Sequence, residues 1–312
     1  MKLRLSPRIL CSCALPWTDR FELDESLFRD VVRGQLAKDQ TSIYLFGTAG
    51  EGYALTLNQF ESISRVFAEE TEGKTSLRQL GIIALAIPQI QERIQVGRAL
   101  GFASFQLSFP SWGELNDFER DLFFETTCGR NPDCSFLFYN VPRGLRWLSP
   151  GELSVLAERY PNLVAVKWAG RVGMSTIRSA VERAPQLCHF VGDIGYAEAS
   201  LKGLKCGQLI AIAASNRLLA SELFELGQTG RNEGRLRQFL KDLHHHSSIL
   251  RTLQMNGSHM DGTYDKLIFK LHHPGFPLRL LPPYLGAGEE AFATYRNRMQ
   301  NELPQWLEPF PE

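Results

Sequence analysis

Charge of one sign is not in excess in this sequence, since lysine plus arginine and aspartate plus glutamate each number 34 in 312 residues. The balance provides no global electric field that would favour nucleic acid or an anionic membrane as a partner. Long hydrophobic runs are also missing, because no stretch reaches the ~18 apolar residues of a membrane span. We therefore expect neither a nucleic-acid-binding protein nor a membrane protein.

Cysteine is scarce, and its six copies show neither CxxC pairs nor the spacing of metal ligands. This distribution argues against a disulfide framework and predicts buried free thiols in a reducing compartment. The basic residues 1–8 and the apolar residues 9–15 are only faintly like a signal peptide. The apolar part is too short, is broken by Pro16 and lacks a small-residue cleavage site. We expect it to form a first strand, and we expect the protein to be cytoplasmic.

What the sequence does contain is an alternation of short apolar stretches with amphipathic ones. The apolar stretches predict eight strands, at 8–14, 42–48, 79–86, 104–109, 135–140, 163–168, 187–192 and 208–214. Helical patterns lie between them at 24–38, 57–72, 89–100, 114–129, 150–160, 173–184 and 196–204, and an eighth begins after Asn216. Because a parallel crossover needs a helix to return the chain, these units predict an α/β fold, a closed (β/α)8 TIM barrel.

The last part of the sequence has helical periodicity without strand alternation. Its expected helices are 231–255, 261–272 and 287–302, interrupted by a proline-rich stretch. We predict two domains, the barrel over residues 1–229 and a C-terminal helical domain over 230–312.

Lys167 is the single charge of the sixth predicted strand and lies at its C-terminal end. Sites of barrels of this kind form where strands end and the following loops begin. On a buried face among small and apolar neighbours, the ammonium loses hydration, which lowers its pKa and frees an amine for attack on a carbonyl carbon. Taken alone, the position also fits a lysine that reaches solvent, or half of a buried ion pair.

Two other strand ends carry groups that suit the same chemistry. Tyr139 ends the fifth strand, ~4.8 Å from the strand of Lys167, and its phenol could move a proton to or from a bound substrate. The alternative is a rim tyrosine bonded to a loop carbonyl. After the second strand, the turn at 47–52 has three glycines and Thr48, which suit a carboxylate or phosphate, although a purely structural turn fits as well.

Together, these strand ends resemble the N-acetylneuraminate lyase and dihydrodipicolinate synthase superfamily. The motifs are Gly47-Thr48-Ala49-Gly50-Glu51, Tyr139-Asn140-Val141-Pro142 and Val166-Lys167, in that order. The resemblance covers essentially the whole chain. It implies a barrel with a helical C-terminal domain, in a homotetramer or dimer, whose lysine forms a Schiff base with pyruvate or another 2-keto acid.

By position, the resemblance implies that Lys167 forms the Schiff base, Tyr139 relays protons, and Thr48 with the backbone near Ala49 holds the keto-acid carboxylate. Further substrate contacts are expected from Gly47, Gly50, Trp112, Arg143, Arg146 and Ala211. No metal or other cofactor is implied, because the protonated imine is the electron sink. The implied enzyme is a class I aldolase-type lyase or synthase whose second substrate is an unidentified aldehyde or sugar acid.

Three positions depart from the pattern of the family. Ala49 stands where relatives often have a second hydroxyl residue, and Trp112 stands where dihydrodipicolinate synthases usually have a relay tyrosine. Gly144 occupies the register of an arginine that holds the second substrate, with Arg143 and Arg146 on either side. We therefore expect a second substrate other than aspartate semialdehyde. A sugar-acid dehydratase that uses the same lysine and a catalytically lapsed barrel that binds a keto acid remain alternatives.

Overall fold

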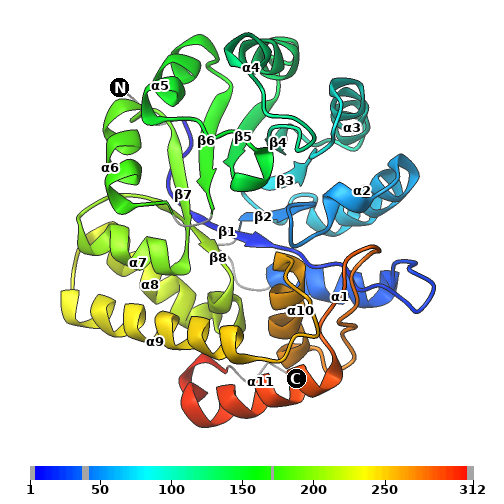
Figure 1. The fold of residues 1–312 in the computed structure, drawn as a ribbon, viewed down its shortest axis with the longest axis vertical. Helices are drawn as coiled ribbons and strands as arrows, with labels where there is room; N and C mark the ends of the chain where they lie inside the picture. Colours follow the sequence, from blue (N-terminus) through cyan, green and yellow to red (C-terminus); the bar gives the residue numbers. More distant parts are fainter. Residues whose placement is uncertain (1–3, 37–41, 170–171, 308–312) are drawn as a thin grey trace.

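The computed structural model describes residues 4–36, 42–169 and 172–307, and its centre is a closed barrel of eight parallel strands in chain order (Figure 1). The strands are β1 (Ile9–Ser12), β2 (Ser42–Leu45), β3 (Arg78–Gly81), β4 (Ser104–Leu107), β5 (Ser135–Asn140), β6 (Leu163–Trp168), β7 (Cys188–Gly192) and β8 (Gly207–Ile210). The predicted (β/α)8 barrel is confirmed. Where predicted elements and domain bounds reach into residues 1–3, 37–41, 170–171 and 308–312, they lie outside the described residues.

Several strands end earlier than the apolar pattern predicts. The bounds of β5 and β6 agree with the prediction, whereas β2, β3 and β8 end at Leu45, Gly81 and Ile210. β2 stops because Phe46 has a left-handed backbone conformation, with φ 63°. After β8, residues Ile212–Ser215 form a 3₁₀ turn, η4. The apolar residues that continue these strands in the sequence therefore belong to the loops at the C-terminal end of the barrel.

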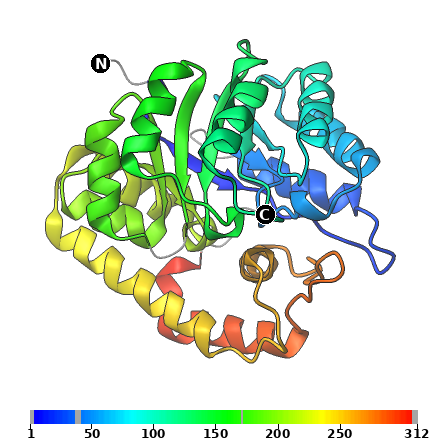
Figure 2. The same ribbon diagram turned by 45° about the horizontal axis from the view of Figure 1, so that its top comes forward.

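Helices alternate with the strands and surround the barrel on its outside (Figure 2). They are α1 (Glu25–Leu36), α2 (Leu57–Thr71), α3 (Ile87–Ala99), α4 (Asp117–Phe124), α5 (Pro150–Arg159), α6 (Met174–Arg183), α7 (Asp193–Leu201) and α8 (Arg217–Thr229). Capping boxes at Thr56, Asn116 and Ser149 satisfy the first backbone N–H groups of α2, α4 and α5. No helix in the described ranges is both long enough and apolar enough to cross a membrane.

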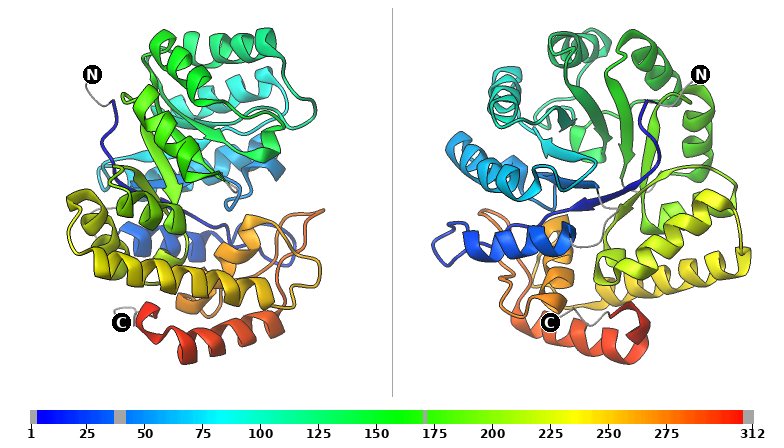
Figure 3. Two further views of the ribbon diagram at one scale, coloured as in Figure 1. Left: turned by 60° about the vertical axis from the view of Figure 1, so that its left-hand side comes forward. Right: turned by 180° about the vertical axis from the view of Figure 1, so that it is seen from behind.

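The chain after α8 forms a helical extension on one side of the barrel (Figure 3). It consists of α9 (Glu233–Thr252), α10 (Asp261–His272) and α11 (Glu289–Glu302), at the places predicted. Gly230, with φ 68°, ends α8, and the proposed domain boundary falls at this turn. α9 packs against α7 and α8, whereas α10 packs against η4 at the end of β8. The extension thereby reaches the C-terminal end of the barrel.

The interior of the barrel is filled by side chains from alternate strand positions. They are Leu10, Tyr44, Leu137, Ala165, Cys188 and Phe190. Because Leu137 and Ala165 face inward, the alternation of the strands turns Tyr139 and Lys167 inward as well. All six cysteines are buried free thiols, as predicted from their spacing.

A buried ion pair joins the barrel to its extension. Nζ of Lys266, on α10, lies 2.7 Å from Oε1 of Glu51, in the turn after β2, and both side chains are 0% exposed. The two oxygens of Glu51 also accept hydrogen bonds from the Trp17 indole at 2.8 Å and from the backbone N–H of Leu281 at 2.6 Å. Lys266 donates a further bond to the carbonyl of Arg279. The pair therefore holds α10 and the segment after it against the turn.

The substitution Lys266→Met should destabilise the protein strongly, because it leaves the Glu51 carboxylate buried with no counter-charge. We expect the free energy of unfolding to fall by about 3–5 kcal/mol, as measured by urea denaturation. Lys74→Met is the matched control, since Lys74 is exposed and its Nζ lies 3.9 Å from Glu70. Its effect should stay within ~0.5 kcal/mol. Similar small losses in both variants would contradict the stabilising role of the buried pair.

Candidate active site

A cavity of about 670 Å³ opens at the C-terminal ends of the barrel strands. Strand residues line one side of it, among them Ser12, Tyr44, Tyr139, Lys167, Gly192 and Ile210. The opposite side is α10, which contributes Asp261, Tyr264, Asp265 and Ile268. The cavity therefore has the position expected for the active site of a barrel of this class.

Lys167 lies in this cavity with only 3% of its surface exposed. Its Nζ donates a hydrogen bond to the Tyr44 hydroxyl at 3.2 Å and lies 3.8 Å from the centroid of the Tyr139 ring. Burial lowers the pKa of Lys167 from 10.5 to about 8, although the negative charges of Asp261 and Asp265 act in the opposite direction. At pH 7 about one molecule in ten then has a neutral amine, compared with about three in ten thousand for an ordinary lysine.

Tyr139 is directly opposite Lys167 in the pairing of β5 with β6. The structure thus brings the two residues together as predicted. Burial raises the pKa of Tyr139 above its ordinary value of 10, whereas a hydrogen bond with the Thr48 side chain acts to lower it. The phenol is therefore neutral at physiological pH. It can accept a proton at its oxygen only while it passes its own proton to a partner, and Thr48 is in place for that transfer.

The turn after β2 presents Thr48 and Ala49 to the cavity. The left-handed residues of this segment are Phe46 and Glu51, with φ 63° and 53°, and not its glycines. The glycines are needed for close packing instead. A Cβ on Gly47 would lie 2.5 Å from the Tyr44 ring, and one on Gly50 would lie 2.8 Å from the Phe46 nitrogen. Gly47 and Gly50 therefore shape the turn without lining the cavity themselves.

Asp193, the first residue of α7, fixes the loop after β8. Its carboxylate accepts hydrogen bonds from the Gln208 side chain at 3.0 Å and from the backbone N–H of Ala211 at 2.9 Å. Ala211 lines the cavity, as predicted. Because Asp193 binds its N–H group, Ala211 can offer a substrate its carbonyl and methyl groups.

A second cavity, of about 370 Å³, adjoins the first, and Thr48 and Tyr139 line both. Arg143 lines this second cavity. Its guanidinium forms an ion pair with Asp261 of α10 at 3.1 Å. Arg143 therefore lies beside the Lys167 cavity, and the structure is compatible with its predicted contact to substrate.

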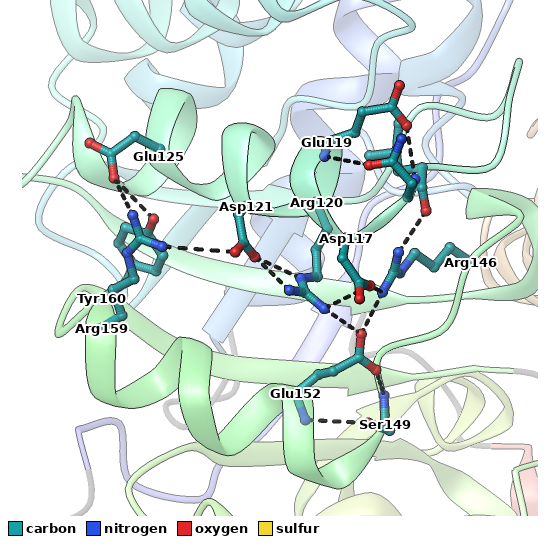
Figure 4. Close-up of polar contacts among 12 residues, drawn as sticks. Asp117, Glu119, Arg120, Asp121, Glu125, Arg146, Ser149, Glu152, Arg159 and Tyr160 are labelled. Carbon is teal, nitrogen blue, oxygen red and sulfur yellow. Dashed lines mark hydrogen bonds and ion pairs between the residues drawn. The ribbon is translucent and has the colours of Figure 1, made fainter.

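Arg146 lines neither of these two cavities. It lies in a cluster of ion pairs between α4 and α5, where its guanidinium is 2.6 Å from Glu152, next to Arg120 and Asp117 (Figure 4). The chain turns away from the site at Leu145, whose backbone is left-handed with φ 58°. The substrate contact expected of Arg146 is therefore corrected to a structural role.

Trp112 also lies apart from the Lys167 cavity. Its side chain is 89% exposed, in the loop between β4 and α4, and it is absent from the lining of both cavities. The expected substrate contact is therefore not formed within one chain.

Three residues at the cavity were not predicted. Tyr44 lies in the middle of β2, between Ile43 and Leu45, which both face outward to the helices. Strict alternation along the strand could therefore have predicted that Tyr44 faces inward. Asp261 and Asp265 lie on α10, one helical turn apart and therefore on one face. That spacing is visible in the sequence, but nothing in it indicates that this face meets a strand end nearly a hundred residues earlier.

Asp265 is the most perturbed of these acids. Burial and the neighbouring charge of Asp261 raise the pKa of Asp265 from 3.8 to about 7, and the positive charge of Lys167 acts in the opposite direction. Near neutral pH this carboxyl therefore exists in both protonation states. Among the described residues, no group of three or more His, Cys, Asp or Glu side chains is arranged to hold a metal ion.

The model of the Dihydrodipicolinate synthetase family matches residues 6–258. The chain belongs to this family. Curated relatives include the 4-hydroxy-tetrahydrodipicolinate synthase of Exiguobacterium sibiricum, 28% identical over 156 residues, and the N-acetylneuraminate lyase of Danio rerio, 22% identical over 159 residues. Each alignment covers 50% of this chain, and 53% and 52% of the relatives, so the chain spans about half the length of the curated relatives it matches.

Solved structures have the same fold over nearly all of the chain. YagE, a prophage protein of E. coli K12 solved in complex with pyruvate, gives a TM-score of 0.82 at 17% identity, with 95% of this chain and 98% of that one covered. The N-acetylneuraminate lyase of Proteus mirabilis gives 0.81 at 14% identity, with the same coverage. The family resemblance inferred from the strand ends is confirmed.

Arg146→Gln should weaken the fold and leave the site intact. Loss of the contacts to Glu152 and to the carbonyl of Leu115 should lower the free energy of unfolding by about 1–2 kcal/mol, measured in urea. The family resemblance implies that a 2-keto acid and borohydride modify Lys167, and the rate of this modification should change less than about twofold. Arg143→Gln is the comparison variant, and only this one should alter that rate. A loss of modification in Arg146→Gln, with the fold retained, would return Arg146 to the site.

Proposed function

We propose that this protein is a Schiff-base-dependent carbon–carbon lyase or synthase that acts on pyruvate or another 2-keto acid. The observation that carries the proposal is the buried amine of Lys167, 3.8 Å from the centroid of the Tyr139 ring, in a cavity that Thr48 also lines. Membership of the dihydrodipicolinate synthetase family supports the same chemistry.

In the first step, the neutral amine of Lys167 attacks the ketone carbon of the keto acid. The carbonyl oxygen leaves as water after it takes up protons, and the nitrogen keeps one proton, so the product is a protonated imine. The lowered pKa of Lys167 favours this step, because only the unprotonated amine is a nucleophile.

In the cleavage direction, a hydroxyl group two carbons from the imine loses its proton and becomes an aldehyde. The electrons of the breaking carbon–carbon bond move toward the imine nitrogen, which becomes a neutral enamine. Tyr139 accepts the proton from the hydroxyl while its own proton passes to Thr48, whose hydroxyl proton moves on to the keto-acid carboxylate. The enamine carbon then takes up one proton, which restores the imine, and water hydrolyses the imine to release the keto acid and the free amine of Lys167. Synthesis is the reverse of these steps. The iminium is the electron sink, so this route requires no metal.

We assign the keto-acid carboxylate to the turn that carries Thr48 and Ala49. Both residues line the cavity that holds Lys167, and the strained residues Phe46 and Glu51 hold the turn from either side. Since Ala49 has no hydroxyl, Thr48 and the backbone would supply the hydrogen bonds to the carboxylate.

The charges around the Lys167 cavity favour a second substrate other than aspartate semialdehyde. Its lining contains Asp193, Glu198, Asp261 and Asp265, against the cations Lys167 and Arg251. A Cβ on Gly144 would lie 3.3 Å from Cβ of Phe109, so this register has little room for a longer side chain. Because Gly144 supplies no cation at the register where relatives hold the second substrate with an arginine, an uncharged polar aldehyde suits this site better than one whose carboxylate needs that contact.

A sugar-acid dehydratase is the second candidate, because Asp265 is a carboxyl near its pKa and could protonate a departing hydroxyl. Product analysis separates the two reactions, since a dehydratase releases water and keeps the carbon chain whole. The homo-oligomer that the resemblance implies stays a prediction.

The proposal is tested by trapping the imine. Pyruvate with borohydride should add one reduced pyruvyl group per chain, on Lys167, as located by peptide mass spectrometry. With excess reductant, so that imine formation limits the rate, the trapping rate should rise with pH and reach half of its maximum near pH 8, where half of the Lys167 amine is neutral, before it levels off one to two units higher. Lys167→Met should abolish the modification, whereas Lys205→Met, outside the cavity lining, should retain it. Equal trapping by Lys167→Met would reject the proposal, and pyruvate binding with no trapping in the unmodified sequence would favour the lapsed barrel.

Tyr139→Phe should retain trapping and lose proton transfer. The exchange of the pyruvate methyl protons with deuterium requires the iminium to form its enamine, and NMR measures it with no second substrate. We expect this exchange, and turnover of any aldol substrate, to fall by ~10²-fold. The control is Tyr160→Phe, whose hydroxyl binds Glu125 in the helix layer. Unchanged exchange in Tyr139→Phe would leave Tyr139 with a packing role only.

A further inference from the structure

We propose that Asp265 is the counter-charge that keeps the Schiff base on Lys167 protonated. The inference rests on the proposed function and assigns to α10 a part in the chemistry. It starts from an electrostatic requirement. An iminium is a cation, and a cation enclosed with a keto acid at the bottom of a cavity needs a negative charge nearby to replace its lost hydration.

No carboxylate touches the amine directly. Among the described residues, no acidic oxygen lies within 4.0 Å of the Lys167 nitrogen, and its one hydrogen-bond partner there is the neutral hydroxyl of Tyr44. The barrel side of the site therefore supplies no counter-charge in contact. The keto acid brings its own carboxylate, which we assign to the turn at Thr48, and Asp193 on α7 is bonded to Gln208 and to the backbone N–H of Ala211. The acids that act on the charge of Lys167 are Asp261 and Asp265, both on α10.

Two acids of α10 face the cavity, and they are not equivalent. The charge of Asp261 is already balanced by Arg143, at 3.1 Å. Asp265 has no cation within 4.0 Å among the described residues, although it lines the same cavity as Lys167. Both acids raise the pKa of Lys167, Asp261 more than Asp265, whereas Arg143, the partner of Asp261, lowers it. Asp265 is therefore the acid of α10 whose charge is not offset by a paired cation.

The position of Asp265 is fixed by its neighbours on α10. Lys266, the next residue, forms the buried pair with Glu51. Gly262 lies so close to the turn that a Cβ there would be 3.2 Å from the carbonyl oxygen of Ala49. α10 is thereby docked on the turn assigned to the keto-acid carboxylate, which holds Asp265 at a set distance from the reacting group.

The lining of the cavity also includes Glu198 on α7 and His244, His246 and Arg251 on α9. The groups that are electrostatically coupled to Asp265 lie on several elements around the cavity. They are Lys167 on β6, Asp261 on α10, Asp193 on α7, Tyr44 on β2, Tyr139 on β5, Cys11 on β1 and Tyr295 on α11. Lys167 is the one cation of this set. The tyrosines and the cysteine are neutral near pH 7, because burial raises the pKa of each. A change in the charge of Asp265 should therefore act mainly on Lys167.

The sign of the effect follows from the pKa of Asp265, which burial raises to about 7. Above pH 7 the carboxylate is ionised and favours the protonated forms of both the lysine and the imine. Well below pH 7 the carboxyl is neutral and resembles an amide. In acid, Asp265→Asn should therefore form the imine at the same rate and to the same extent as the unmodified sequence. The two proteins should differ progressively in both quantities as the pH rises through 7 and 8.

The experiment compares the full chain with Asp265→Asn, using pyruvate alone as the probe. Two quantities are measured over the neutral pH range by borohydride quenching and mass spectrometry: the initial rate of imine formation and the fraction of chains that carry the imine at equilibrium. Glu290→Gln, which removes an exposed acid from α11, controls for net charge. Asp265→Ala repeats the measurement if the asparagine variant does not fold.

In Asp265→Asn we expect the pH midpoint of the formation rate to fall by about half a unit or more, because Lys167 loses a charge that favours its ammonium form. The equilibrium fraction of imine should fall about threefold or more above pH 8 and match the unmodified sequence in acid. These opposite changes would support the proposal, since general damage to the site lowers both quantities at every pH.

Two results would overturn the inference while leaving the proposed function in place. In the first, the rate of imine formation and the equilibrium fraction of imine in Asp265→Asn have the same pH profiles as in the unmodified sequence. In the second, both quantities fall by the same factor at every pH. If the unmodified sequence forms no imine with pyruvate at any pH, the proposed function fails and the role of Asp265 fails with it.

Discussion

The pair between Glu51 and Lys266 is the contact on which the rest of the site depends. Two opposite charges with no exposed surface are costly to bury, and their attraction offsets that cost only when each is fully bonded. Here Glu51 also accepts bonds from Trp17 and Leu281, and Lys266 donates to Arg279. The result is a fixed connection between the turn after β2, to which we assign the keto-acid carboxylate, and α10, which lines the cavity opposite Lys167.

The reactivity of Lys167 is a balance between two opposing effects. Burial in the barrel favours the neutral amine, which can attack a ketone, whereas the acids of α10 favour the cation. Either effect alone would impair one of the two steps that the proposed reaction needs. A lysine with a much lower pKa would form a neutral imine that is a poor electron sink, and one with an ordinary pKa would rarely attack. A pKa of about 8 allows both steps near neutral pH.

The parts of the site that follow from local patterns could be predicted from the sequence. Apolar, β-branched runs and strict alternation placed Lys167 and Tyr139 on facing positions of β6 and β5. Arg146 was misplaced because the left-handed turn at Leu145 redirects the chain. The end of β2 was extended too far because Phe46 adopts a conformation that its side chain does not suggest. In each case one backbone angle, invisible in a hydrophobic pattern, decided the outcome.

Asp265 shows a different limit. Its spacing from Asp261 identifies a helix face, but only tertiary packing determines what that face meets. The partner of the adjacent lysine is Glu51, about two hundred residues earlier, and no local rule connects the two positions. Functional groups supplied by an extension are therefore the hardest to find from a single sequence.

The place of α10 in the chain has a consequence for biosynthesis. The barrel strands, with Lys167 and Tyr139, emerge from the ribosome well before residues 261–272. A nascent chain in which α10 has not docked leaves the lysine cavity open to water, where an amine keeps its proton and does not attack ketones. If Lys167 forms the Schiff base that we propose, keto compounds therefore meet a reactive lysine only after α10 has docked on the barrel.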